Sequence, residues 1–132
     1  MNDKLNQYIE DIRADLNFDI INVTEAARKL PARRHYWSAR LVEHKIRVHT
    51  LKRNKSEIIK AVSARVAASS PVGMDGKNIT RAAESSDEIQ HINSEIAECE
   101  IIIEFLESVA KNFFTATYDI KNIIELMKLE QS

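Results

Sequence analysis

Apolar residues recur along this chain at intervals of three and four positions, which is the spacing of a helix that buries one face. The first set lies in an acidic segment and predicts an N-terminal helix over residues 1–17. Its apolar positions are Leu5, Tyr8 or Ile9, Ile12 and Leu16. The chain has only two glycines and two prolines in 132 residues. With so few turn residues, an all-α protein built from long helices is expected.

A longer helical pattern fills the basic segment over residues 24–68. Thr24 can cap a short helix that Pro31 is expected to interrupt or restart, and no helix breaker follows up to residue 68. On a helix with about 100° per residue, one arc of this segment is apolar and another carries cations. The apolar arc holds Trp37, Leu41, Val48, Leu51, Ile58, Ile59, Val62 and Val66, and the cationic arc holds Lys45, His49, Lys52, Arg53 and Lys60.

Turn residues gather in one place. Both glycines and the second proline fall within residues 69–78, which predicts a loop there. Acidic C-terminal helices are expected over residues 79–132, with Ser85 and Glu88 as a capping box. The end of this region carries an apolar stripe with the spacing i, i+3, i+4, i+7, formed by Ile120, Ile123, Ile124 and Met127.

The lengths of these helices constrain the assembly. A helix of about 35 residues is roughly 50 Å long. A compact domain of 132 residues would have a radius of gyration of only about 14 Å. We therefore expect a single all-helical domain over residues 1–132, shaped as an elongated helical hairpin or bundle. Its uncovered apolar stripes favour assembly into a homo-oligomeric ring. Exact heptads are not sustained, which argues against a simple two-stranded coiled coil.

The charge is segregated although the net charge is only −1. Residues 28–65 hold 12 basic and 2 acidic side chains, whereas residues 66–132 hold 5 basic and 12 acidic ones. This local excess of positive charge is larger than solubility requires. It indicates a polyanionic partner for the middle segment, with nucleic acid as the first candidate.

The residues that catalysis or metal binding would need are sparse. The chain has no glycine-rich phosphate loop, and a Glu-x-x-His pair of the kind found in di-metal bundles occurs once, at Glu88 and His91. The one cysteine, Cys99, is expected in the core, and a lone cysteine fits a reducing compartment. The longest apolar run is Ile101–Ile103, which is too short for a membrane span. The N-terminal segment carries acids where a signal peptide would have its apolar core. We expect a cytoplasmic protein that is not an enzyme and needs no cofactor or metal.

The basic segment therefore predicts a nucleic-acid surface. Lysine and arginine neutralise phosphates without reading bases, so the binding should be independent of sequence and sensitive to salt. No helix-turn-helix, zinc-finger or sheet-platform pattern is present, which leaves single strands or general backbone binding. Trp37 is expected in the core, and Tyr36 is expected to stay available for stacking on a base. The candidate contact residues are Arg33, Arg34, Arg40, Lys45, Lys52, Arg53 and Lys60.

Three stretches give the chain a family resemblance: "WSARLVEHKI" (37–46), "IIKAVSARVAA" (58–68) and "FFTATYDIKNIIELMKLE" (113–130). Over about residues 20–130 it resembles the phage recombination mediators of the UvsY family. The resemblance implies a short all-helical protein that forms a closed ring, a heptamer in the type member. It also implies binding to single-stranded DNA, partnership with a RecA-like recombinase and a single-strand-binding protein, and location in the host cytoplasm.

The resemblance also assigns roles to residues. The family's Lys-Ala-Arg-Leu motif, linked to DNA binding, corresponds here to Ser63-Ala64-Arg65-Val66. Arg65 would keep its role in the motif, Ser63 replaces the lysine, and Lys60 lies one turn earlier. The family's C-terminal helix is associated with oligomerisation, which would assign that role to the stripe at the end of the chain.

Two other functions fit the same residues. One is a structural or interaction protein, such as an assembly chaperone or a virion component, whose basic face binds an acidic protein. The other is an enzyme built on a carboxylate bundle, which would carry bound iron or manganese. An oligonucleotide-binding assay at low and high salt separates the first from a DNA-binding protein, and metal analysis tests the second.

Overall fold

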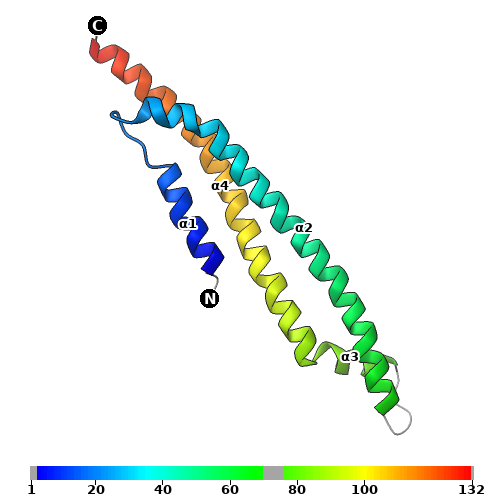
Figure 1. The fold of residues 1–132 in the computed structure, drawn as a ribbon. Helices are drawn as coiled ribbons and strands as arrows, with labels where there is room; N and C mark the ends of the chain where they lie inside the picture. The colour runs from blue at the N-terminus through cyan, green and yellow to red at the C-terminus, as the bar shows by residue number, and fades with distance from the viewer. Residues whose placement is uncertain (1–2, 70–75, 132) are drawn as a thin grey trace. The chain divides into compact units, whose positions relative to one another are not determined.

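The computed structural model describes residues 3–69 and 76–131. Within these ranges the chain is all-α, as expected, and contains no strand (Figure 1). Most of the predicted loop lies outside the described residues, and its last three residues belong to a helix instead. The described helices also include none with the length and apolar character of a membrane span. The four helices are α1 (Asp3–Asp15), α2 (Val23–Ser69), α3 (Gly76–Glu84) and α4 (Asp87–Gln131).

The chain divides into two compact units, each built from segments distant in sequence. Unit 1 combines Met1–Glu43 with Ile102–Ser132, and unit 2 is His44–Ile101. The first part of α2 and the last part of α4 therefore belong to unit 1, while the remaining parts of both helices belong to unit 2 together with α3.

Unit 1 has a core to which three helices contribute. Its largest fully buried side chain is Phe113 of α4, and the indole of Trp37, which is 3% exposed, lies in the same cluster. The tyrosine ring of Tyr8 in α1 meets that indole edge-to-face, with the ring centroids 5.2 Å apart. Together the core residues are Tyr8, Ile12, Val23, Leu30, Trp37, Ile102, Leu106, Val109, Phe113, Ala116 and Ile120.

Unit 2 has its own buried residues on α2, α3 and α4. Ile89 and Ala83 are almost completely inaccessible, and His44 is a buried polar side chain, 6% exposed. Figure 1 shows the second part of α2 running alongside the first part of α4, and three ion pairs described below join the two helices. The buried apolar residues of this unit are Val48, Leu51, Val62, Ala83, Ile89, Ile92, Ile96 and Cys99.

The buried side of α2 follows a heptad spacing. From Trp37 to Val62 all of its buried positions and several half-buried ones follow one another in steps of four and three, which is the spacing of a coiled-coil seam. Apolar heptads are still not sustained along α2, because two of these seam positions are polar. They are His44 and Lys55, which also lie within the apolar arc of the helical wheel. The seam residues are Trp37, Leu41, His44, Val48, Leu51, Lys55, Ile58 and Val62.

The start of α2 differs from the prediction. A hydrogen-bonded turn precedes it: Oδ1 of Asp19 accepts bonds from the backbone N–H groups of Ile21 and Asn22, and the Asp19 N–H donates to Oδ1 of Asn22. The helix then begins at Val23 and continues through Pro31, so the expected interruption there is wrong. Pro31 is exposed, and it costs the helix one hydrogen bond. Burial of Leu30 and Trp37 on either side of it offsets that loss.

The predicted capping box is also wrong. The Ser85 hydroxyl donates to the backbone carbonyls of Arg81 and Ala82 in the last turn of α3. Ser86 precedes α4, and its hydroxyl accepts a hydrogen bond from the Ile89 N–H. Ser86 is therefore the N-cap of α4.

Candidate nucleic-acid interface

The predicted DNA-binding cations all lie on α2, but they fall into both units. Arg33, Arg34 and Arg40 belong to unit 1. The remaining five belong to unit 2: Lys45, Lys52, Arg53, Lys60 and Arg65. The two groups therefore lie in different compact units.

In unit 1 two arginines enclose a tyrosine. The guanidinium carbons of Arg33 and Arg40 lie 4.3 and 4.6 Å from the ring centroid of Tyr36, one helical turn before it and one after it. Both distances are within the range of a cation–π contact. The expectation that Tyr36 is open for stacking is therefore corrected, because a base would first have to displace a guanidinium from the ring.

Carboxylates hold both arginines in place. Nε of Arg33 donates to Oδ2 of Asp15 at 2.9 Å, and the indole Nε1 of Trp37 donates to the same oxygen at 2.7 Å. Nη2 of Arg40 donates to Oε1 of Glu43 at 2.7 Å. Hydrogen bonds with Tyr36 and Glu43 raise the pKa of Arg40 above its ordinary value. The two arginines form a fixed, charge-compensated cluster, and the core position predicted for Trp37 is confirmed.

In unit 2 carboxylates of α4 reach across to cations of α2. Nη2 of Arg47 lies 3.1 Å from Oε2 of Glu95, and Nζ of Lys52 lies 3.6 Å from Oε1 of Glu100. Arg65 pairs with Glu88 in the same way. Sequence reasoning omitted Arg47, although it lies within the basic stretch at residues 45–55. Its distance from the cationic arc on the helical wheel explains the omission.

The cations of unit 2 lie on different sides of α2. At about 100° per residue, Arg53 and Lys60 point away from the seam. Lys52 lies on one flank of the seam, and Arg47 and Arg65 lie on the other flank, about 120° from Arg53. Lys60 also has an ion pair, with Glu57 of its own helix at 3.9 Å. Arg65 is therefore not part of the strip formed by Lys45, Lys52, Arg53 and Lys60.

Two of the predicted contact residues carry uncompensated charge. Arg34 in unit 1 and Arg53 in unit 2 are exposed, and neither pairs with any residue of the described ranges 3–69 and 76–131. They can meet a phosphate without breaking a contact within the chain. Lys45 is exposed as well.

The C-terminal stripe faces inward to a large extent. Ile120 lies in the unit 1 core, and Ile123, Ile124 and Met127 are half-buried against that core. The opposite side of α4 carries a second apolar stripe, which the sequence analysis did not identify. Its members lie within an arc of about 120° on the helical wheel. They are Phe114, Tyr118, Leu126 and Leu129, whose exposed fractions range from 55 to 70%.

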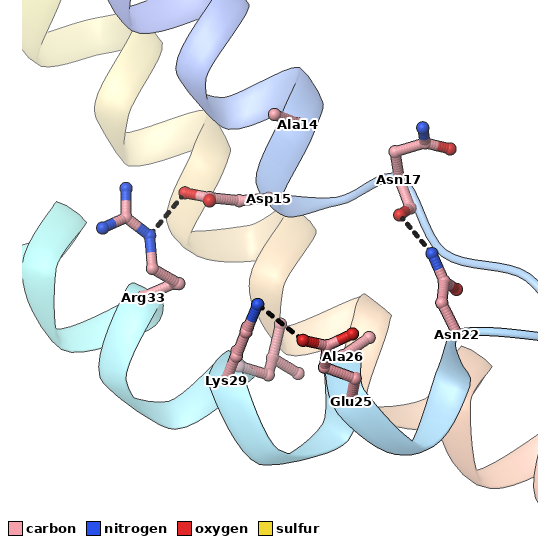
Figure 2. A pocket seen from close by; sticks show the side chains of 9 residues that line it. Ala14, Asp15, Asn17, Asn22, Glu25, Ala26, Lys29 and Arg33 are labelled. Atoms are coloured by element: carbon pink, nitrogen blue, oxygen red, sulfur yellow. Dashed lines mark hydrogen bonds and ion pairs between the residues drawn. The ribbon is translucent and has the colours of Figure 1, made fainter.

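A pocket of about 400 Å³ lies in unit 1 at the start of α2 (Figure 2). Its charged side chains pair with one another: Asp15 with Arg33, and Glu25 with Lys29 at 2.9 Å. The hydrogen bond with Lys29 lowers the pKa of Glu25. The pocket thus offers no uncompensated charge to a small ligand. Within residues 3–69 and 76–131, no three His, Cys, Asp or Glu side chains gather as a metal site would require.

Comparison with known proteins gives one match that spans nearly the whole chain. The model of the family described as "Recombination, repair and ssDNA binding protein UvsY" matches residues 7–132. No curated protein and no solved structure matches the chain.

Proposed function

The chain belongs to the UvsY family of recombination, repair and single-stranded-DNA-binding proteins, and on this basis we propose that it is a recombination mediator. In this role it binds single-stranded DNA without reading its sequence. It helps a RecA-like recombinase replace the single-strand-binding protein that covers the DNA. It acts without catalysing a reaction of its own.

The observation that carries this proposal is the concentration of cations on α2, with Lys45, Lys52, Arg53 and Lys60 as its basic face. Twelve cations lie between residues 28 and 65, and Arg34 and Arg53 are exposed there with no partner among the described residues. A helix face of this kind suits the sugar–phosphate backbone, since it presents charge but no set of groups arranged to read base edges. The fixed Arg33–Tyr36–Arg40 cluster supports backbone contacts over base stacking at that point.

Binding to a fluorescein-labelled oligonucleotide tests the proposal. If about six phosphates are neutralised at each site, the log–log slope of affinity against salt should be near −4 for a single strand. A fourfold rise in salt then weakens binding by about 250-fold. An affinity that does not change with salt would contradict the proposal. The mediator role is tested separately, by the lag before a RecA-like recombinase starts ATP hydrolysis on covered single-stranded DNA, which this protein should shorten.

We also propose that the protein works as a homo-oligomeric ring, with the heptameric form that the family resemblance implies. The exposed Phe114, Tyr118, Leu126 and Leu129 support self-association, because an apolar stripe on a helix favours a partner that covers it. Ile123, Ile124 and Met127 on the opposite side of α4 are half-buried against the unit 1 core, and the part of them that stays exposed is a second apolar surface for the assembly. Several copies of the basic face on one ring would raise the avidity for a long strand well above the affinity of one copy. Sedimentation velocity measures the number of subunits.

A further inference from the structure

Three glutamates of α4 pair with α2 cations in unit 2, and these pairs bear on how α2 meets DNA. We propose that Glu88, Glu95 and Glu100 hold the positions that DNA phosphates take in the complex. Binding of a strand then exchanges internal ion pairs for phosphate contacts. The inference rests on the proposed binding of single-stranded DNA by α2.

The geometry of the pairs supports an exchange. A carboxylate and a phosphate present the same two-oxygen edge to a guanidinium, so Arg47 and Arg65 can accept either partner. Lys52 binds oxygen as a point charge and can also change partner. Glu88 and Glu95 approach one flank of the α2 seam, and Glu100 approaches the other. A strand that contacts the α2 cations of both flanks therefore meets all three carboxylates.

The exposure of the pairs makes the exchange possible. The paired side chains of Lys52, Arg65, Glu88 and Glu100 are between 54 and 63% exposed. In the third pair Arg47 is 58% exposed, and Glu95, which also contacts Nε2 of His91 at 3.0 Å, is 34% exposed. Ion pairs this exposed contribute little free energy. Each is expected to lower the affinity for DNA by about 1.4- to 5-fold. The carboxylates also repel the incoming phosphates. The three glutamates together should weaken binding by about tenfold or more.

The test replaces all three glutamates by glutamine, as Glu88→Gln, Glu95→Gln and Glu100→Gln in one protein. Glutamine keeps the shape and the helix propensity and removes only the charge. A matched control carries Glu104→Gln, Glu125→Gln and Glu130→Gln, which makes the same change in net charge on the same helix. These three side chains are exposed and have no ion pair among the described residues. The dissociation constant for a labelled oligonucleotide is measured for each protein.

The first variant should bind about tenfold more tightly than the unaltered protein, and the control about twofold or less. Equal effects in the two variants would overturn the inference, because net charge alone would then explain the gain. Binding by neither the unaltered protein nor the first variant, even at low salt, would overturn the proposed function itself. Binding by the unaltered protein with no gain in the first variant overturns only the exchange.

A double-mutant cycle keeps the inference testable even if the triple variant folds poorly. Glu100→Gln should tighten binding about two- to fivefold in the unaltered protein. In a Lys52→Gln background, the same change should do no more than Glu104→Gln does. A gain that is independent of Lys52 would show that Glu100 does not mask that lysine. The inference would then be wrong for this pair.

Discussion

Asp15 should be a main determinant of unit 1 stability, although it lies at the end of α1. Its Oδ2 accepts hydrogen bonds from Trp37 and Arg33, and its side chain is 15% exposed. Asp15→Ala leaves the buried indole N–H without a partner, which costs about 1–3 kcal/mol. Loss of the half-exposed arginine pair adds at most about 1 kcal/mol. An acid at a helix C-terminus is unfavourable by about 0.3–1 kcal/mol, so the net loss should be about 2 kcal/mol.

Urea unfolding measures this loss, with emission from Trp37, the one tryptophan of the chain, as the signal from unit 1. Asp11→Ala is the matched control, because Asp11 lies one turn earlier on α1 and accepts a hydrogen bond from the exposed Gln7. The control should change the free energy of unfolding by less than about 0.5 kcal/mol. A loss for Asp15→Ala no larger than that of the control would refute the reasoning.

A double-mutant cycle identifies the partner responsible. Trp37→Phe keeps an aromatic ring in the core but removes the indole N–H. In that background Asp15→Ala should lower the free energy of unfolding by about 1 kcal/mol less than it does in the unaltered protein, because the unsatisfied donor is absent. Circular dichroism replaces fluorescence as the signal in these proteins. If Asp15→Ala lowers the free energy of unfolding equally in both backgrounds, the loss is due to the contact with Arg33.

Three further predictions follow from the same contacts. Arg34→Gln combined with Arg53→Gln should reduce the salt slope of DNA binding by about 1.4, whereas Lys111→Gln with Lys121→Gln, the same charge change on α4, should leave it nearly unchanged in the same anisotropy titration. Leu126→Asp with Leu129→Asp should dissociate the proposed oligomer in sedimentation velocity, since burying these charges is costly; an unchanged subunit number would show that the exposed stripe is not an interface. Burial raises the pKa of Tyr8, so the unfolded chain loses the phenolic proton at a lower pH than the folded protein, and stability should fall as the pH rises above about 10. The urea midpoint should therefore fall between about pH 8 and about pH 10.5, and it should fall less for Tyr8→Phe than for the unaltered protein.

The helical character of the chain could be predicted because it depends on local spacing. The apolar arc of α2 placed Trp37, Val48, Leu51 and Val62 correctly in the buried set. The helical wheel also places His44 and Lys55 within this arc, and the structure finds His44 buried and Lys55 half-buried on that side of α2.

The pairing of charges could not be predicted, because it depends on which carboxylates another helix brings near α2. Lys52 was predicted from the cationic arc and Arg65 from the family resemblance, and the structure pairs them with Glu100 and Glu88 on opposite flanks of the seam. The exposed stripe of α4 could have been found from the spacing of Phe114, Tyr118, Leu126 and Leu129. It was overlooked because the neighbouring Ile120, Ile123 and Ile124 form a denser stripe.

The burial of Cys99 has a practical consequence for following unit 2 in solution. Cys99 is 6% exposed, so a maleimide or iodoacetamide reagent reaches its thiol only when the surrounding helices separate. Because the chain has no other cysteine, the alkylation rate of the natural protein reports how often unit 2 opens locally around Cys99. Mass spectrometry measures this rate with and without an oligonucleotide, and no residue needs to be replaced.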